Sequence, residues 1–194
     1  MFPSIQQSVL DLKQEVSKAI SNLRVKSPDF EFAYDTYVQE YGEAKLFLGS
    51  EPTDLSDTID KVAITLGRTC TVFYSDSKRS LRGNFGEIKF QPGACYIVGR
   101  RQPQDQRLVC WTPEVAVELE EYDSRASIIP SRVHCAFIYS ESGVKFLDLG
   151  SSSGTVLVGE SSGTGPFVIA YDPGAVRPSI RFDRISTARL AYQV

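Results

Sequence analysis

The sequence predicts a mainly β protein, an antiparallel β-sandwich of about eleven strands that follows a small α-helical region. Two observations lead to this prediction. As far as about residue 68 the apolar residues recur with the period of a helix, whereas the rest of the chain has short alternating apolar runs separated by Gly, Pro and Ser. No helical stretch lies between these runs, and this favours an antiparallel sandwich over a parallel sheet with crossover helices.

The first expected helix covers residues 4–25. Ser4 is in place to cap it, with Gln7 three residues further on, as in a capping box. A single apolar stripe follows at spacings of four and three residues, formed by Ile5, Val9, Leu12, Val16, Ala19 and Leu23. We expect this stripe to be buried against the second helix, the sandwich or a second copy of the chain. The first is favoured because antiparallel helix pairs with short loops are common.

A second helix is expected to begin after Ser27, because Pro28 suits a first turn and Asp29 suits the positive end of the helix dipole. Gly49 is expected to end it. Its apolar stripe is formed by Phe30, Ala33, Tyr37, Tyr41, Ala44 and Leu48. A third, weaker helix is expected at 53–66, although the run KVAITL within it could equally begin a strand.

Beyond these helices the chain contains eleven runs with the length and composition of strands. In order they read TVFYS, GEIKF, CYIVGR, RLVCW, AVELEEY, VHCAFIY, VKFLDL, TVLVG, FVIAY, SIRF and ARLAY. The helical part is acidic and the strand-rich part is nearly neutral. We therefore expect two units, a helical segment of two or three helices at 1–68 and a sandwich domain at 69–194. No Pro/Ser-rich linker separates them, so they are expected to pack together.

Composition argues against several classes of protein. No apolar run approaches the length that a membrane span needs, and the start of the chain lacks the basic and apolar stretches of a secretory signal. The net charge of −3 argues against a nucleic-acid partner held through its phosphates. The four cysteines form no C-x-x-C pair and lie in strand-like runs, as expected of buried, reduced thiols in a cytoplasmic protein.

Three motifs follow one another in the strand-rich part. The pair GR at 99–100 closes the run CYIVGR, SRVH at 131–134 opens the run HCAFIY, and FLDLGSSSGTVLV contains a Gly/Ser turn at 150–154. In this order they strongly resemble the forkhead-associated (FHA) domain, whose hallmark is G-R, then S-R-x-H, then D-L-G-S-x-N-G-T. The final FDRISTARLAY is similar to the family's closing pattern, with Phe182 in place of a glycine. The resemblance covers roughly residues 69–194 and implies an FHA-like sandwich.

These residue types suit the binding of a phosphorylated side chain. A phosphate monoester brings nearly two negative charges and three strong acceptor oxygens. Binding it needs a fixed guanidinium, hydroxyl donors and exposed backbone N–H groups at one end of a rigid scaffold. Arg100 supplies a guanidinium, Ser131 a short donor, and the turn from Gly150 to Gly154 a run of small residues that can present N–H groups. Loops at one end of a sandwich can bring the three together.

The resemblance implies a role for each matching residue. In the family these positions bind phosphothreonine in a partner protein, which implies that Arg100 and Ser131 contact the phosphate. It also implies that Arg132 and Ser152 line the same site, and that Ser153 stands where the family has an asparagine that clamps the peptide backbone. The residues expected to support the shape of the site are Gly99, His134, Gly150 and Gly154.

No enzymatic activity is expected. His134 is the single histidine of the sequence, and the resemblance implies that its ring hydrogen-bonds within the binding loops. His134 and Cys135 are neighbours on a strand and point to opposite faces, so they do not readily form a catalytic pair. One histidine and scattered cysteines do not build a usual zinc site. The turn GSSSGT lacks the Lys-Ser/Thr and the helix of a nucleotide-binding loop. We therefore expect no catalytic residue, no metal and no cofactor.

The chain departs from the FHA pattern in three ways. Ser153 is shorter than asparagine, and losing one hydrogen bond of the clamp costs on the order of 1 kcal/mol. The stretch between Arg100 and Ser131 is long, and its acids would repel a phosphate and favour basic residues in a peptide; they are Glu114, Glu118, Glu120, Glu121 and Asp123. This stretch could instead be a solvated surface hairpin, with Arg100 a surface cation paired to one of its acids. The helical first third has no counterpart in the minimal domain.

Two functions are therefore open. The first is a cytoplasmic, non-enzymatic signalling adaptor that binds a phosphothreonine written on a partner protein by a Ser/Thr kinase. Its helices would mediate homo-oligomerisation or fix the domain in a larger assembly. The alternative is a degenerate FHA fold that acts as a structural, oligomerising or docking subunit independent of phosphate. Ser153 favours the alternative, whereas the intact GR and SRVH motifs favour phosphate binding.

Overall fold

The computed structural model of the chain describes residues 5–47, 52–55, 59–67, 70–101, 105–112, 114–126, 128–161, 165–171 and 179–181. Two helices come first, α1 (Ile5–Lys26) and α2 (Pro28–Tyr41), and a short 3-10 turn follows at Glu43–Lys45. A second 3-10 turn lies at Asp76–Lys78.

The remaining elements are strands in two antiparallel sheets. The order in one sheet is β1-β10-β9-β6-β7-β8, and in the other it is β13-β12-β11-β2-β3-β4-β5. The first sheet has six strands, β1 (Thr53–Leu55), β6 (Cys95–Arg100), β7 (Arg107–Trp111), β8 (Ala116–Glu121), β9 (Cys135–Ser140) and β10 (Gly143–Asp148). The second has seven, β2 (Ile59–Leu66), β3 (Cys70–Ser75), β4 (Ser80–Arg82), β5 (Glu87–Lys89), β11 (Thr155–Ser161), β12 (Gly165–Tyr171) and β13 (Ser179–Arg181). The predicted β-sandwich with helices before it is confirmed.

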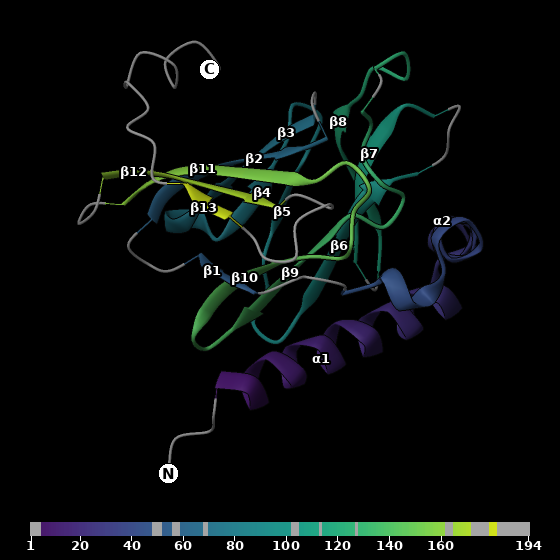
Figure 1. The fold of residues 1–194 in the computed structure, drawn as a ribbon, viewed down its shortest axis with the longest axis horizontal. Coiled ribbons are helices and arrows are strands. Elements are labelled where there is room, and N and C mark those ends of the chain that lie inside the picture. Colours follow the sequence, from purple (N-terminus) through teal and green to yellow (C-terminus); the bar gives the residue numbers. More distant parts are fainter. Residues whose placement is uncertain are drawn as a thin grey trace.

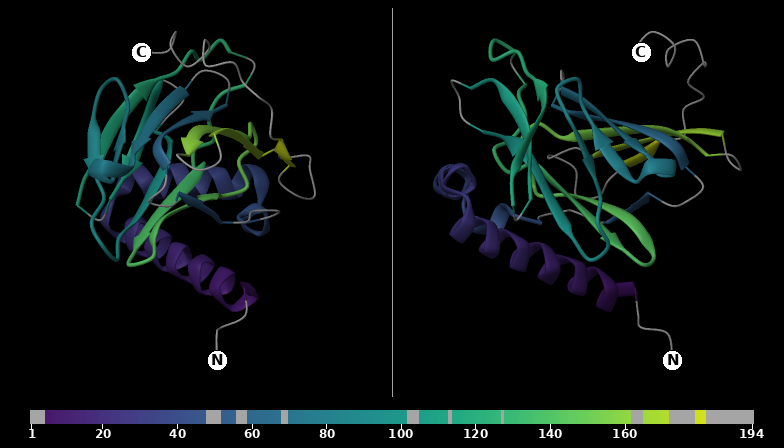
Figure 2. Two further views of the ribbon diagram at one scale, coloured as in Figure 1. Left: turned by 90° about the vertical axis from the view of Figure 1, so that its left-hand side faces the viewer. Right: turned by 180° about the vertical axis from the view of Figure 1, so that it is seen from behind.

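The helices and the two sheets form three layers. Figures 1 and 2 show α1 and α2 on the side of the six-stranded sheet that faces away from β2 and β3. One hydrophobic core lies between the sheets, and a second lies between the six-stranded sheet and the helices. Neighbouring residues of β9 enter different cores, since Phe137 belongs to the first and Ala136 and Ile138 to the second. Burial on both faces explains why this strand reads as a continuous apolar run.

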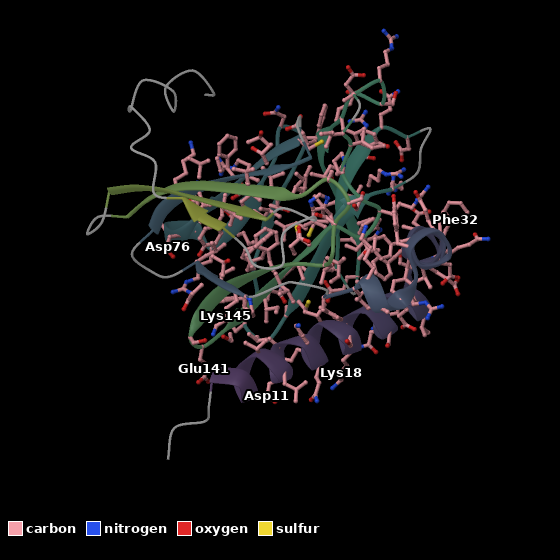
Figure 3. All side chains as sticks on the ribbon, viewed as in Figure 1. Asp11, Lys18, Phe32, Asp76, Glu141 and Lys145 are labelled. Atoms are coloured by element: carbon pink, nitrogen blue, oxygen red, sulfur yellow. The ribbon has the colours of Figure 1, made fainter. Side chains whose placement is uncertain are left out.

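The apolar stripe of α1 is largely buried in the second core. Its buried members are Leu12, Val16, Ile20 and Leu23. Ile20 is an addition to the predicted stripe, while Val9 and Ala19 are half-buried. The predicted capping box and the first stripe residue fall outside the side chains that the structure describes. Figure 3 shows Asp11 and Lys18 projecting from the opposite side of the helix, away from the sandwich.

The second helix begins as predicted and ends earlier than predicted. The Ser27 hydroxyl accepts a hydrogen bond from the Phe30 N–H at 3.3 Å, as expected of an N-cap. The helix ends at Gly42, which has a φ of 81° and donates its N–H to the Val38 carbonyl at 2.7 Å. The prediction that α2 runs to Gly49 is therefore wrong, because Gly42 already provides the stop. Of the predicted stripe, Phe30, Ala33 and Tyr37 are buried, Tyr41 and Ala44 are exposed, and Leu48 lies outside the described residues.

The prediction of a third helix at 53–66 is wrong, and the alternative of a strand is correct. This stretch supplies β1 and β2, and β2 lies between β3 and β11 in the seven-stranded sheet. Val62, Ile64 and Leu66 are fully buried in the core between the sheets, at the spacing of two that a strand requires. Two strands of the sandwich thus come from residues before position 68. The division of the chain into two domains stays a prediction.

Ten of the eleven predicted strands are present, and the eleventh, at 188–192, lies outside the described residues. The prediction missed β1 and β4, each of which has only three residues, and it gave β2 only as the alternative to a helix. Three of the four cysteines, Cys70, Cys110 and Cys135, are buried as predicted, whereas Cys95 is half-buried. Among the described residues no helix is long and apolar enough to cross a membrane.

Candidate functional site

The three motifs meet at one end of the sandwich. The Arg100 N–H, at the end of β6, donates to the Ser131 carbonyl in the loop before β9 at 3.1 Å. The Leu149 N–H, at the start of the turn between β10 and β11, donates to the His134 carbonyl at 2.9 Å. Backbone hydrogen bonds therefore hold the GR strand end, the SRVH loop and the Gly/Ser turn against one another. The sequence predicted this convergence.

Gly99 is required where β6 passes the SRVH loop. A Cβ at position 99 would lie 1.9 Å from the Arg132 carbonyl oxygen and 3.1 Å from that of Ser131. Both contacts are with backbone atoms, so any larger residue would push the strand and the loop apart. The glycine of the GR motif thus sets the distance between Arg100 and the loop.

His134 is fully buried and joins two of the loops. Its Nδ1 accepts the Ser131 N–H at 3.0 Å, so the neutral ring carries its proton on Nε2. Nε2 lies 3.1 Å from the Gly154 carbonyl oxygen and 2.9 Å from Thr155 Oγ1. Burial lowers the pKa of His134, and the neighbouring Asp148 opposes this effect. The neutral imidazole therefore ties the SRVH loop to the end of the Gly/Ser turn.

Asp148 belongs to the same network and was missed by the sequence analysis. Its Oδ1 accepts the Ser151 N–H at 2.8 Å, and its Oδ2 accepts the hydroxyls of Ser151 at 2.8 Å and Thr155 at 2.7 Å. The Ser151 hydroxyl in turn accepts the Gly154 N–H at 3.1 Å. His134 Nε2 lies 4.0 Å from Oδ2. An aspartate two residues before a Gly/Ser turn is the signal that could have found it, because such a carboxylate readily accepts hydrogen bonds from the turn.

Ser131 and Ser152 contact each other directly. The Ser131 hydroxyl accepts the Ser152 N–H at 2.8 Å, and the two hydroxyl oxygens are 2.9 Å apart. Ser131 is buried and Ser152 is exposed. The structure therefore brings together two of the residues expected to line the site. A ligand that used both hydroxyls would replace the hydrogen bond between them.

Arg100 is buried, with 8% of its surface exposed, and is not the surface cation considered as an alternative. The nearby Tyr122 favours its charged form. Burial lowers the pKa of Arg100, and the positive charge of Arg132 lowers it further. The cation that pairs with the long stretch between the motifs is its neighbour Arg101, which lies 3.3 Å from Glu118.

Arg132 forms an ion pair with Glu40 of α2. The Arg132 side chain is only 12% exposed, whereas the Glu40 side chain is 46% exposed. The pKa of Glu40 is lowered, chiefly by a hydrogen bond from Tyr41 and also by Arg132. An acid of the helical segment thus reaches a residue of the candidate site, which the sequence analysis did not foresee.

Three polar atoms of the candidate site are buried and lack a hydrogen-bond partner among the described residues. They are Arg100 Nε, Arg132 Nε and Ser153 Oγ. Buried polar groups in folded proteins are nearly always paired, and each unpaired one costs roughly 1–3 kcal/mol. Two unpaired guanidinium N–H groups close to one another point to an anion as the partner they suit.

The end of α2 lies on the Gly/Ser turn. The Tyr37 hydroxyl is buried and donates to the Gly150 carbonyl at 2.9 Å. A Cβ at Gly150 would lie 2.1 Å from the Lys45 carbonyl oxygen, so the chain after α2 also passes close to the turn. The pKa of Tyr41 is raised, chiefly by Glu40 and by burial, and the nearby Ser152 opposes this effect. Tyr37 and Tyr41 appear in the sequence only as members of an apolar stripe, which gives no sign of these polar contacts.

The acids of the long stretch lie on or beside the β7–β8 hairpin. Glu118 pairs with Arg101 and Arg107, and Glu120 accepts a hydrogen bond from the Asn84 side chain at 3.1 Å. The remaining acids, Glu114, Glu121 and Asp123, are exposed. The interpretation of this stretch as a surface hairpin is correct.

Within the described ranges, no group of three or more His, Cys, Asp and Glu side chains could hold a metal ion. Comparison of the chain with protein-family models, with curated proteins and with solved structures gives no match. The resemblance to FHA domains, the ligand and the roles of the site residues therefore stay predictions.

Proposed function

We propose that this protein is a non-enzymatic, cytoplasmic signalling adaptor whose FHA-like sandwich binds a phosphothreonine in a partner protein. Arg100 and Arg132 would supply the positive charge, and Ser131 and Ser152 the hydroxyl donors. Ser153 would lie beside the peptide backbone. A Ser/Thr kinase that modifies the partner would control the interaction.

The observation that carries this proposal is the pair of guanidinium groups at one end of the sandwich. Arg100 and Arg132 lie close enough for the charge of the second to lower the pKa of the first. Each has a buried Nε without a partner among the described residues. A phosphate would relieve the repulsion and accept charge-assisted hydrogen bonds, each contributing roughly 1.5–3 kcal/mol.

The network beneath the guanidinium groups also supports the proposal. His134 and Asp148 are buried and hold the SRVH loop and the Gly/Ser turn through hydrogen bonds of 2.7–3.1 Å. Rigid loops lose little freedom when a ligand binds, so more of the interaction energy appears as affinity. This arrangement suits a preformed binding site.

The proposal is tested by titrating the purified chain with two degenerate peptide libraries. One library has a fixed central phosphothreonine, and the other has threonine at the same position. We expect saturable binding of the first and none of the second at the same concentration. A third library with phosphoserine tests whether the methyl group of threonine is recognised. Equal binding of the phosphorylated and unphosphorylated libraries, or no binding of either, would overturn the proposal.

A phosphate-independent docking subunit is the second candidate. Three observations favour it: Glu40 already neutralises Arg132, the Ser131 and Ser152 hydroxyls bond each other, and Ser153 replaces the asparagine of the FHA pattern. In this case the sandwich would hold its partner through surface contacts elsewhere. Replacing Arg100 and Ser131 together would then leave partner binding unchanged.

A further inference from the structure

The last turn of α2 contacts the candidate phosphate site at two independent points. Tyr37, with no exposed surface, anchors the helix to the Gly150 carbonyl at 2.9 Å. Three residues later, Glu40 forms its ion pair with Arg132. Residues three apart on a helix lie on the same side, so the anchor and the ion pair face the loops together. The helical segment therefore covers the site instead of standing apart from it.

Glu40 presents to this site the chemistry that a phosphate would present. Its carboxylate is an anion with two acceptor oxygens, and it accepts a hydrogen bond from the Arg132 guanidinium. Its charge also acts on Arg100, whose pKa it raises against the larger effect of burial. One carboxylate thus pairs with Arg132 and acts electrostatically on Arg100, the two cations that the proposed function assigns to the phosphate.

The Glu40 side chain can leave without moving the helix. It is 46% exposed, and α2 ends two residues later at Gly42. Tyr37, Phe30 and Ala33 remain buried on the inner side and hold α2 in place. Turning one exposed side chain toward water is a small rearrangement, and an ion pair with one exposed partner is a weak barrier to it.

We propose that Glu40 is an internal competitor for the phosphate site, which occupies Arg132 in the free protein and which a phosphorylated partner must displace. This inference rests on the proposed function, because it concerns the regulation of the same site. The consequence is selectivity for phosphate. A dianionic phosphate displaces the Glu40 carboxylate, whereas a singly charged Asp or Glu of a partner binds Arg132 no more strongly than Glu40 does and therefore does not displace it.

The test is the affinity of Glu40→Gln for the phosphothreonine library. Glutamine keeps the length of the side chain and removes its charge, so it no longer competes for Arg132. We expect binding about fivefold tighter than in the parent chain. The melting temperature should fall only slightly, because Glu40 is 46% exposed although its partner Arg132 is not. Glu40→Asp keeps the charge but shortens the side chain by one methylene, so its affinity should lie between those of the parent and Glu40→Gln. It replaces Glu40→Gln as the test if the glutamine variant folds poorly.

Two further variants separate competition from a general charge effect. Asp35→Asn makes the same change in net charge on the same helix and also breaks an ion pair, with Arg24 at 2.8 Å, but that pair is not part of the site. It should bind the library as the parent does. In an Arg132→Gln background, Glu40→Gln should gain much less than it does alone, because the group for which it competes has been removed.

The outcomes distinguish this inference from the function on which it rests. If the parent chain binds the phosphothreonine library and Glu40→Gln binds no tighter, Glu40 is not a competitor and the inference is wrong while the function stands. The inference is also wrong if Asp35→Asn gains as much affinity, or if the gain survives unchanged without Arg132. If neither the parent nor Glu40→Gln shows phosphate-dependent binding, the proposed function itself fails, and the inference fails with it.

Discussion

At the scale of single residues, the candidate site depends on two side chains that are almost fully buried. His134 has no exposed surface, and Asp148 has 5%. Between them they accept or share hydrogen bonds with Ser131, Ser151 and Thr155, so removing either ring or carboxylate leaves several buried partners unpaired. This hydrogen-bond network therefore fixes the shape of the loops, and through the loops it fixes the positions of the proposed binding residues.

Replacing His134 with alanine should lower the stability of the fold and remove part of its acid sensitivity. The unpaired partners cost about 1–3 kcal/mol each. In the folded protein burial lowers the pKa of His134, so below its ordinary value of 6.5 the unfolded chain binds the extra proton more readily. Stability due to the neutral ring is therefore present above pH 6.5 and is lost as the pH falls below it, by up to about 1.4 kcal/mol per pH unit.

Melting temperatures of the parent and His134→Ala between pH 5 and 8 measure this effect. His134 is the single histidine of the sequence, so a titration near pH 6 has no second imidazole as its source. The parent should lose stability between pH 6.5 and 5, and the variant should lose less over the same interval. Parallel curves for the two proteins would show that the ring does not become charged on unfolding.

Arg100 should be needed for phosphate binding and also contribute to folding. Arg100→Ala removes a guanidinium group that can donate two hydrogen bonds to a phosphate. We therefore expect its affinity for the phosphothreonine library to fall at least tenfold. Because the side chain is buried, the melting temperature should fall as well. Arg100→Lys should restore part of the affinity, since it keeps the charge without the bidentate geometry.

The matched control for this experiment is Arg101→Ala. Arg101 is the next residue and carries the same charge, but it forms surface ion pairs with Asp29, Asp105 and Glu118. Surface pairs contribute about 0–1 kcal/mol, so this variant should keep both its stability and its affinity. An equal loss of affinity in the two variants would mean that net charge, and not the position of one guanidinium, controls binding.

At this scale, the sequence predicted the positions of residues whose local geometry is fixed by a short motif. It did not predict residues whose environment depends on contacts between distant parts of the chain. The positions of Gly99, Ser131 and His134 in one constellation could be predicted because each belongs to a short ordered motif. The burial of Arg100 could not, since it depends on how segments distant in sequence pack around the end of β6. The Glu40–Arg132 pair joins residues 92 positions apart. Arg132 belongs to the SRVH motif, but no local pattern marks Glu40.

At the scale of elements, the second strand shows why pattern alone misassigned the stretch at 53–66. Leu55, Ile59 and Val62 recur at spacings of four and three, which fits one face of a helix. The alternation that defines β2 begins only at Val62 and continues through Ile64 and Leu66. The stretch thus contains both a helical and a strand-like spacing of apolar residues, and it forms a strand because it pairs with β3 and β11. Such pairing is a tertiary effect that local propensity does not contain.

The stripe of α1 should contribute strongly to stability, and its opposite side should not. Leu23 is 1% exposed in the core beneath the helices, so Leu23→Ala should lower the free energy of unfolding by about 2–5 kcal/mol. Leu10 lies on the same helix but is 52% exposed, so Leu10→Ala should change the free energy of unfolding by no more than about 0.5 kcal/mol. Urea unfolding of the two variants gives both values. Similar effects at both positions would contradict the observed orientation of α1.

At the scale of the whole molecule, the six-stranded sheet is the central layer and needs cover on both faces. Its first face packs on the seven-stranded sheet, and its second face packs on the helices. Ile97, Trp111 and Ile138 are buried on the second face and lie in the same core as the α1 stripe. The helical segment is thus part of the hydrophobic structure of the sandwich, and its apolar stripe is already occupied within one chain.

Deleting residues 1–26 therefore tests whether α1 serves the fold or self-association. Without α1, the apolar side chains of the second face would meet water, and exposed patches of this kind promote aggregation. We expect the intact chain to scatter light with the mass of one chain, because its stripe is not free to pair with a second copy. The truncated chain should melt at a lower temperature and form large, polydisperse aggregates. The opposite result, an intact dimer that becomes a stable monomer after the deletion, would show that α1 is a dimerisation helix and that its packing on the sheet is secondary.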